Sequence, residues 1–114
     1  MRCFEMSKNQ IHVDCSKIVD WETFHDEFQE KMGFFDGYGR NMNAWIDCMG
    51  DMYTNGEYES LSKFSLNDGD IFTLILDQSE GFIENHLDIF SGLCECISFV
   101  NNQDENISLN LELR

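Results

Sequence analysis

The segment from Phe35 to Asp51, FDGYGRNMNAWIDCMGD, carries the residues best suited to contacting a partner. Asn43, Asp47 and Asp51 recur at steps of four, so on a helix they form one polar ridge. Such a ridge can bind a cleft lined with cationic side chains, imitating a strand of phosphates and bases. The alternative is an ordinary solvated helix face, which is what most charged helical stretches are.

Three further residues lie beside this ridge. Asp36 and Tyr38 fall in the loop that leads into the helix, and Tyr38 offers a ring together with a hydroxyl. Ile46 flanks the ridge on the helix itself. We expect these residues to enlarge the same contact surface, with the ring of Tyr38 at its head.

The residue types that usually carry catalysis or bind metals are scattered along the chain. His12, His25 and His86 fall on one expected strand and two expected helices, and the acids that follow His25 do not face it on a helix. Cys94 and Cys96 are a close thiol pair, without the second pair of a structural zinc site. No glycine-rich phosphate loop is present. We therefore expect no catalytic site, no metal and no cofactor.

Charge is the strongest compositional signal. The chain of 114 residues has 22 Asp and Glu against 7 Lys and Arg, a formal net charge of −15 and a pI near 4.2. This field repels phosphate backbones, which argues against nucleic-acid binding, and it attracts basic proteins such as nucleases. The alternative is that the charge serves only solubility.

The length and the absence of linkers and repeats predict a single domain spanning residues 1–114. Residues 1–8, MRCFEMSK, carry little pattern, and we expect a loose N-terminal arm or a short extra strand there. The five cysteines are odd in number and lie in hydrophobic stretches, as expected of reduced thiols. With no signal peptide and no membrane-length apolar run, we expect a cytoplasmic protein.

Hydrophobic periodicity predicts the elements that position the ridge. A first strand lies in QIHVDC, and a helix with Asp20 as N-cap ends at Gly33. A second helix spans about 41–53, a polar segment 54–70 follows, and IFTLIL is a strand covered on both faces. Residues 79–100 form one long helix or two short ones, and the last strand alternates from Ile107 to Leu113. This order indicates an α/β fold with a small parallel sheet and crossover helices.

The run from Tyr38 to Cys48 fits the pattern Y-G-x-N-x-x-A-x-x-D-C. It resembles the central motif of barstar-family ribonuclease inhibitors, and VDCSKIVDWETFHDEF looks like that family's opening strand and first helix. The resemblance covers about residues 10–53, IFTLIL falls at the second strand, and the C-terminal third agrees in element order. It implies a barstar-like, three-stranded parallel β-sheet packed by α-helices, and stoichiometric occlusion of a secreted ribonuclease inside the producing cell.

The resemblance also implies roles for individual residues. Asp47 matches the aspartate that enters the phosphate-binding site of the nuclease. Gly39 and Asn41 match positions at or beside the contact, and Tyr38 matches the second of two adjacent tyrosines. A late acid that contacts the nuclease in the family corresponds to Glu105.

Three contact positions depart from the family pattern. Gly37 stands where the family has the tyrosine that stacks on the partner, Asn43 replaces a second helix acid, and Ile46 replaces an interface tryptophan. These departures favour a basic ribonuclease other than a close barnase equivalent, for example the toxic tip of a polymorphic toxin.

Our first hypothesis is therefore an immunity protein of a toxin–antitoxin pair, a monomer that forms a 1:1 complex with a basic ribonuclease toxin domain and binds neither nucleic acid nor membrane. The alternative is a barstar-fold interaction module for a non-ribonuclease toxin or a regulatory partner. A third possibility, an enzyme, has no constellation of residues to support it.

Overall fold

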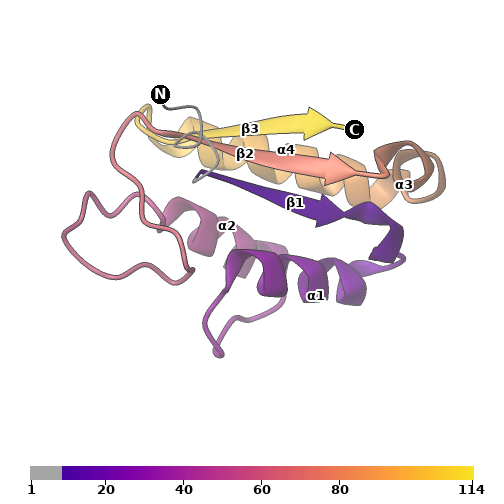
Figure 1. Ribbon diagram of the computed structural model, residues 1–114, viewed down its shortest axis with the longest axis horizontal. Coiled ribbons are helices and arrows are strands. Elements are labelled where there is room, and N and C mark those ends of the chain that lie inside the picture. The colour runs from indigo at the N-terminus through magenta and orange to yellow at the C-terminus, as the bar shows by residue number, and fades with distance from the viewer. Residues whose placement is uncertain (1–8) are drawn as a thin grey trace, which may run out of the picture.

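The computed structural model describes residues 9–114, so the expected N-terminal arm at residues 1–8 lies outside the described residues. Its elements follow one another in two strand–helix–strand crossovers (Figure 1). They are β1 (Gln10–Asp14), a 3-10 turn (Cys15–Lys17), α1 (Trp21–Met32), α2 (Met42–Gly50), β2 (Ile71–Asp77), α3 (Ser79–Asn85), α4 (Leu87–Gln103) and β3 (Ser108–Leu113). Within residues 9–114, no helix has the length and apolar character needed to cross a membrane.

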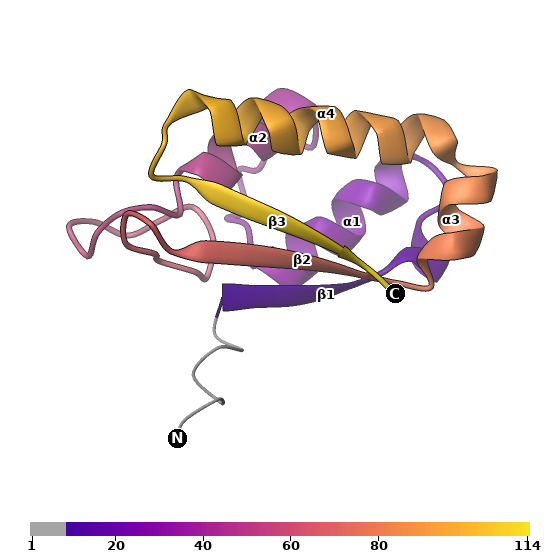
Figure 2. The same ribbon diagram turned by 90° about the horizontal axis from the view of Figure 1, so that it is seen from above.

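The three strands form one parallel sheet in the order β1-β2-β3. Ile11 pairs with Leu74, and Leu74 pairs with Leu111 on its other side. Figure 2 shows α1, α2 and α4 on one face of this sheet and α3 beyond the ends of the strands. The predicted α/β fold with a three-stranded parallel sheet and crossover helices is thereby confirmed.

Strand β2 was predicted to be buried on both faces, and its first residues depart from that prediction. Phe72, Leu74 and Leu76 are fully buried, and Ile75, which points to the opposite face, is buried as well. Ile71 remains exposed because it opens the strand at the edge of the packed region. The expected coverage of both faces therefore holds only for the second half of the strand.

Helix α1 begins and ends at the predicted signals, and α2 begins at its own N-cap. Asp20 and Thr23 form a capping box at the start of α1, and Gly33 ends the helix with φ +66°. Asn41 caps α2 by accepting a hydrogen bond from the backbone N–H of Ala44 at 2.8 Å.

Helix α2 ends at Gly50, three residues earlier than the predicted range, and a long-range contact explains why. The hydroxyl of Tyr53 donates to the carbonyl of Asp70 at 2.6 Å and accepts from the N–H of Ser108 at 3.1 Å. Tyr53 is thus drawn toward the start of β3, and the chain must leave the helix before it.

The 79–100 region resolves into two helices that meet at His86, the second of which continues to Gln103.

The buried carboxylate of Glu27 joins α1 to the end of β1. The carboxylate of Glu27, only 3 % exposed, accepts from the Nζ of Lys31 at 2.7 Å and from the backbone N–H of Asp14 at 2.8 Å. The hydrogen bond to Glu27 raises the pKa of Lys31 above its usual value. Because both charged groups are satisfied, burial of this acid is tolerated.

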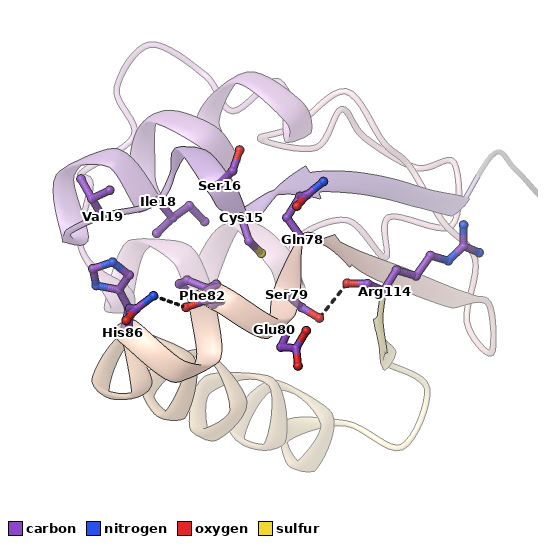
Figure 3. Close-up of a pocket in the computed structure, with 12 residues that line it drawn as sticks. Cys15, Ser16, Ile18, Val19, Gln78, Ser79, Glu80, Phe82, His86 and Arg114 are labelled. Carbon is purple, nitrogen blue, oxygen red and sulfur yellow. Dashed lines mark hydrogen bonds between the residues drawn. The ribbon is translucent and has the colours of Figure 1, made fainter.

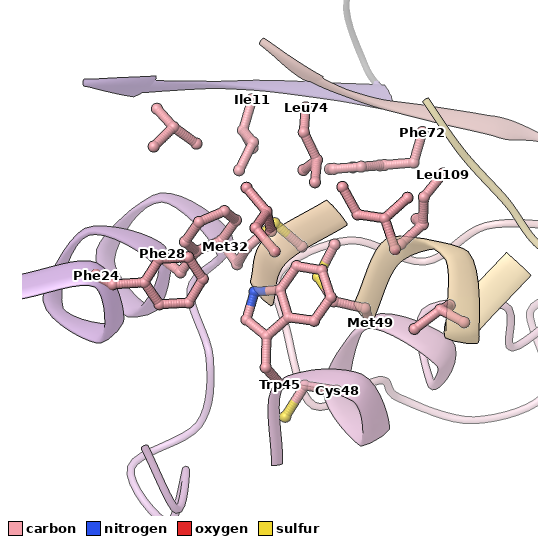
Figure 4. Close-up of a cluster of buried hydrophobic side chains, with 14 of the residues drawn as sticks. Ile11, Phe24, Phe28, Met32, Trp45, Cys48, Met49, Phe72, Leu74 and Leu109 are labelled. Atoms are coloured by element: carbon pink, nitrogen blue, oxygen red, sulfur yellow. The ribbon is translucent and has the colours of Figure 1, made fainter. Parts of the chain in front are cut away.

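Trp45 lies at the centre of the core, between α1, α2 and the sheet (Figure 4). Its ring stands edge-on to Phe28, with centroids 5.6 Å apart and planes at 83°. Its Nε1 has no hydrogen-bond partner within residues 9–114, and Figure 4 shows this nitrogen on the side of the Phe24 and Phe28 rings. An aromatic face is a weak acceptor, so it offsets only part of the cost of burying that N–H.

Replacing Trp45 by Ala should lower the free energy of unfolding by about 3–5 kcal/mol, because a large cavity opens in the core. Urea or thermal denaturation measures the change. Asp47→Ala is the control in the same helix, and it should leave stability nearly unchanged or slightly raised because one self-repelling acid is removed. Equal losses in the two variants would show that the orientation of α2 is wrong.

Candidate protein-binding surface

The outward side of α2 presents Asn43 and Asp47 to solvent, as their spacing predicts. Asp51, the third member of the predicted ridge, is half-buried, and its Oδ2 accepts from the backbone N–H of Leu61 at 2.9 Å. The ridge therefore has two free side chains, and its last carboxylate anchors the loop that follows the helix. This is a correction to the expectation that all three side chains are equally free.

Tyr38 is buried, at 5 % exposure, and the expectation that it presents its ring and hydroxyl to a partner is not met. Its hydroxyl shares a 2.6 Å hydrogen bond with the Nδ1 of His25, and its ring packs on Phe34 with centroids 4.6 Å apart. Two of the three aromatic side chains of the loop, Phe34 and Tyr38, thus turn inward, and Phe35 stays exposed. Asp36, Gly37 and Gly39 remain on the outside.

Desolvation sets the protonation of this pair. Burial, followed by the positive charge of Arg40, lowers the pKa of His25, and Asp26 acts weakly in the other direction. Burial also raises the pKa of Tyr38 well above its usual value. Both groups are therefore neutral at physiological pH, and a neutral hydrogen-bonded pair is the form that a buried site favours.

Arg40 fixes the end of the loop to α1. It adopts φ +56°, and its guanidinium donates to Gln29 Oε1 at 2.9 Å, to the carbonyl of Glu22 at 3.0 Å and to Asp26 Oδ1 at 2.6 Å. A single side chain thus holds the loop at three points on one helix face. Sequence reasoning missed this role, although a lone arginine inside an acidic segment was a signal for it.

Gly39 and Asn41 set the start of α2 and remain exposed. The Asn41 side chain caps the helix, and a Cβ on Gly39 would lie 3.4 Å from that of Ala44, so the chain passes close to the helix there. The Asn41 side chain can still bind a partner, because its amide nitrogen makes one long hydrogen bond, 3.4 Å, to the Gly39 carbonyl and its Oδ1 has a second lone pair.

The remaining predicted residues lie around α2. Ile46 is half-buried against the core, and so offers a partner less apolar area than a free side chain would. Glu105 is exposed in the turn after α4. The end of α4 lies beside α2, because a Cβ on Gly50 would come 3.6 Å from Gln103 Oε1. Glu105 therefore follows a segment that borders the candidate surface.

A cavity of about 570 Å³ lies at the carboxyl ends of the strands and is the alternative place for a site (Figure 3). Burial raises the pKa of its Cys15 thiol to about 12, so the thiol stays protonated and is a poor nucleophile. The Ser79 hydroxyl donates to the Arg114 carbonyl at 2.8 Å. Among the described residues, no hydrogen bond joins the His86 ring to either group. The described part of this cavity thus has no activated nucleophile.

Comparison with known proteins identifies the family of the chain. A family model described as Barstar (barnase inhibitor) matches residues 8–114, which is nearly the whole chain. The match includes the C-terminal third, where the sequence motifs were weakest. No curated protein matches the chain significantly.

The lowered pKa of His25 predicts how stability changes with pH. Between the folded pKa and the ordinary value of about 6.5, the unfolded chain binds more protons than the folded one. The free energy of unfolding should therefore fall as pH drops through about 6.5, and this contribution should level off below the folded pKa. His25→Gln should remove it.

The measurement is the urea midpoint of the parent and of His25→Gln between pH 7.5 and 5.5. His12, His86 and the carboxylates contribute to both proteins alike, so the difference between the two profiles isolates His25. Parallel profiles would contradict the buried, neutral state assigned to this residue.

Proposed function

This chain belongs to the barstar (barnase inhibitor) family, and from this premise we propose that it is the immunity protein of a basic ribonuclease toxin. In this proposal the loop at residues 36–39 and the outward side of α2 occupy the active-site cleft of the toxin. The carboxylate of Asp47 takes the place of a substrate phosphate among cationic side chains. The enzyme is blocked because RNA cannot enter.

The free carboxylate of Asp47 is the observation that carries this proposal. It lies on the exposed side of α2, and within residues 9–114 no hydrogen bond or ion pair engages it. The four ion pairs of the described chain involve acids on the strands and on α1. A carboxylate left without an internal partner is available to the cations of another protein.

The loop beside Asp47 supports tight binding because it is held in place before the partner arrives. The His25–Tyr38 bond and the three bonds of Arg40 fix the loop to α1. Little conformational entropy then remains to be lost on association, which favours affinity.

The proposal has three further parts. The protein lies in the cytoplasm of the toxin-producing cell, binds the toxin 1:1 and catalyses no reaction. The lack of an activated nucleophile in the described part of the strand-end cavity is consistent with an inhibitor. The departures at Gly37, Asn43 and Ile46 favour a basic ribonuclease other than a close barnase equivalent. In a second candidate function, the same surface binds a non-ribonuclease toxin or a regulatory partner.

The direct test is titration of ribonuclease activity. The protein would be used to capture basic partners from its host, together with any toxin domain encoded by the adjoining gene, and each purified partner would be assayed on RNA. We expect complete inhibition at one equivalent. A partner that is bound tightly but cleaves no RNA would support the second candidate instead.

Asp47→Asn should weaken binding by roughly 2–5 kcal/mol, which is the general range for removing one member of a desolvated charge pair at an interface. Complexes of this family are among those from which that range was drawn. Asn43→Ala should have a smaller effect, because an amide binds cations less strongly than a carboxylate. Titration calorimetry and toxin-rescue growth are the measurements. Glu84→Gln, which removes an equal charge from the exposed side of α3, is the matched control. If Asp47→Asn binds and protects like the parent, the inhibitory surface lies elsewhere.

Association should be steered by charge. With a net charge of −15, the on-rate for a basic toxin should fall about tenfold or more between low and physiological ionic strength, while the off-rate changes far less. Stopped-flow mixing measures both rates. A flat salt profile would argue against a charge-complementary partner.

A further inference from the structure

Two apolar side chains from distant parts of the chain lie next to the candidate surface. Phe35 is 44 % exposed and Leu61 is 36 % exposed, and the N–H of Phe35 donates to the carbonyl of Leu61 at 3.0 Å. Single exposed apolar residues are common on protein surfaces, but here a backbone hydrogen bond holds two of them together across 26 positions of sequence. We call this pair the Phe35–Leu61 patch.

The patch is continuous with the acidic side of α2. The N–H of Leu61 donates to the carboxylate of Asp51, which lies one helical turn after Asp47. Asp36, exposed, directly follows Phe35 in the chain. Each member of the apolar pair thus has an acid beside it, Asp36 next to Phe35 and Asp51 next to Leu61.

The loop that carries Leu61 is long but held at several points (Figure 1). The N–H of Lys63 donates to the carbonyl of Met32 at 2.9 Å, and the N–H of Leu66 donates to that of Met52 at 2.7 Å. These bonds tie the loop to the ends of α1 and α2. Leu61 is therefore presented by a fixed backbone.

Gly37 leaves room for the Phe35 ring. A Cβ on Gly37 would lie 2.5 Å from Cε2 of that ring, closer than side chains can approach. The ring therefore occupies the space that any side chain at position 37 would need. Gly37 and Phe35 are coupled, and a substitution at the first must move the second.

We infer that the Phe35–Leu61 patch is a second contact of the inhibitory surface, and that it receives an apolar or aromatic side chain flanked by cations on the rim of the ribonuclease cleft. This inference rests on the proposed function and extends it to residues for which neither the motif nor its spacing gave a role. Charge selects this occupant over a second copy of the chain. Asp36 and Asp51 border the patch, and a partner of net charge −15 would be repelled. Lys63 is the cation of the loop that carries Leu61, and its Nζ lies over the Phe64 ring, 5.7 Å from the ring centre. Its charge is thus placed on Phe64.

The test measures the dissociation constant between the ribonuclease that the parent protein inhibits and a set of variants, with a thermal melt of each. Phe35→Ala should weaken binding about 10- to 100-fold, as expected for a well-packed interface aromatic, and Leu61→Ala should weaken it by a smaller factor. Leu87→Ala, which removes a 58 % exposed apolar side chain at the start of α4, should leave binding within about twofold.

A double-mutant cycle tests the coupling between Gly37 and Phe35. Gly37→Ala should weaken binding when Phe35 is present, because the ring must move, and should have little further effect when Phe35 is already Ala. Additive effects of the two changes would overturn the assigned role of Gly37.

The outcomes separate this inference from the proposed function. If Asp47→Asn abolishes inhibition while Phe35→Ala and Leu61→Ala bind like the parent and melt normally, the patch is not a contact and the proposed function stands. If the parent inhibits no ribonuclease, both proposals fail. Weakening by the patch variants, with Leu87→Ala unaffected, supports the inference.

Discussion

The proposed binding surface depends on the hydrogen bond between the buried side chains of His25 and Tyr38. It joins α1 to the loop before α2, and the stacking of Tyr38 on Phe34 closes the loop over the core. Loss of either partner would leave a buried polar group unsatisfied, at a cost of about 1–3 kcal/mol. Tyr38 is buried and Gly39 is exposed, so the chain returns to the surface at Gly39. Two residues later, the side chain of Asn41 caps α2. The His25–Tyr38 contact therefore helps to position the start of α2, the helix that carries Asp47.

Charge is distributed so that stability and binding use different acids. Arg40 pairs with Asp26 and Lys31 pairs with Glu27, so two of the few cations offset two of the four acids of α1. No ion pair of the described chain involves the exposed acid of α2. Leaving that carboxylate uncompensated costs stability through self-repulsion, as is common at sites kept for binding. A partner that supplies the missing cations removes this cost on association.

Much of this architecture could be predicted from local patterns, because alternation, caps and the position of Gly33 act over a few residues. The orientation of Tyr38 could not, since a loop has no periodicity to show which side chains turn inward. The early end of α2 also escaped prediction, because it depends on a contact between Tyr53 and Ser108, 55 positions later. For the same reason Asp51 was assigned to the ridge, whereas its carboxylate holds a backbone N–H ten residues away. The departures from prediction thus arise where distant segments meet.

Amide hydrogen exchange of the free protein and of its complex with the inhibited ribonuclease tests the central claim most directly. The loop at residues 36–39 and the first turn of α2 include backbone N–H groups without intrahelical acceptors, and such groups exchange quickly in the free protein. Burial of these N–H groups by a partner should therefore slow their exchange measurably. The account predicts slower exchange in this loop and turn, with the neighbourhood of Leu61 also protected. Protection confined to α3 and the strand-end cavity, with residues 36–43 unchanged, would contradict it.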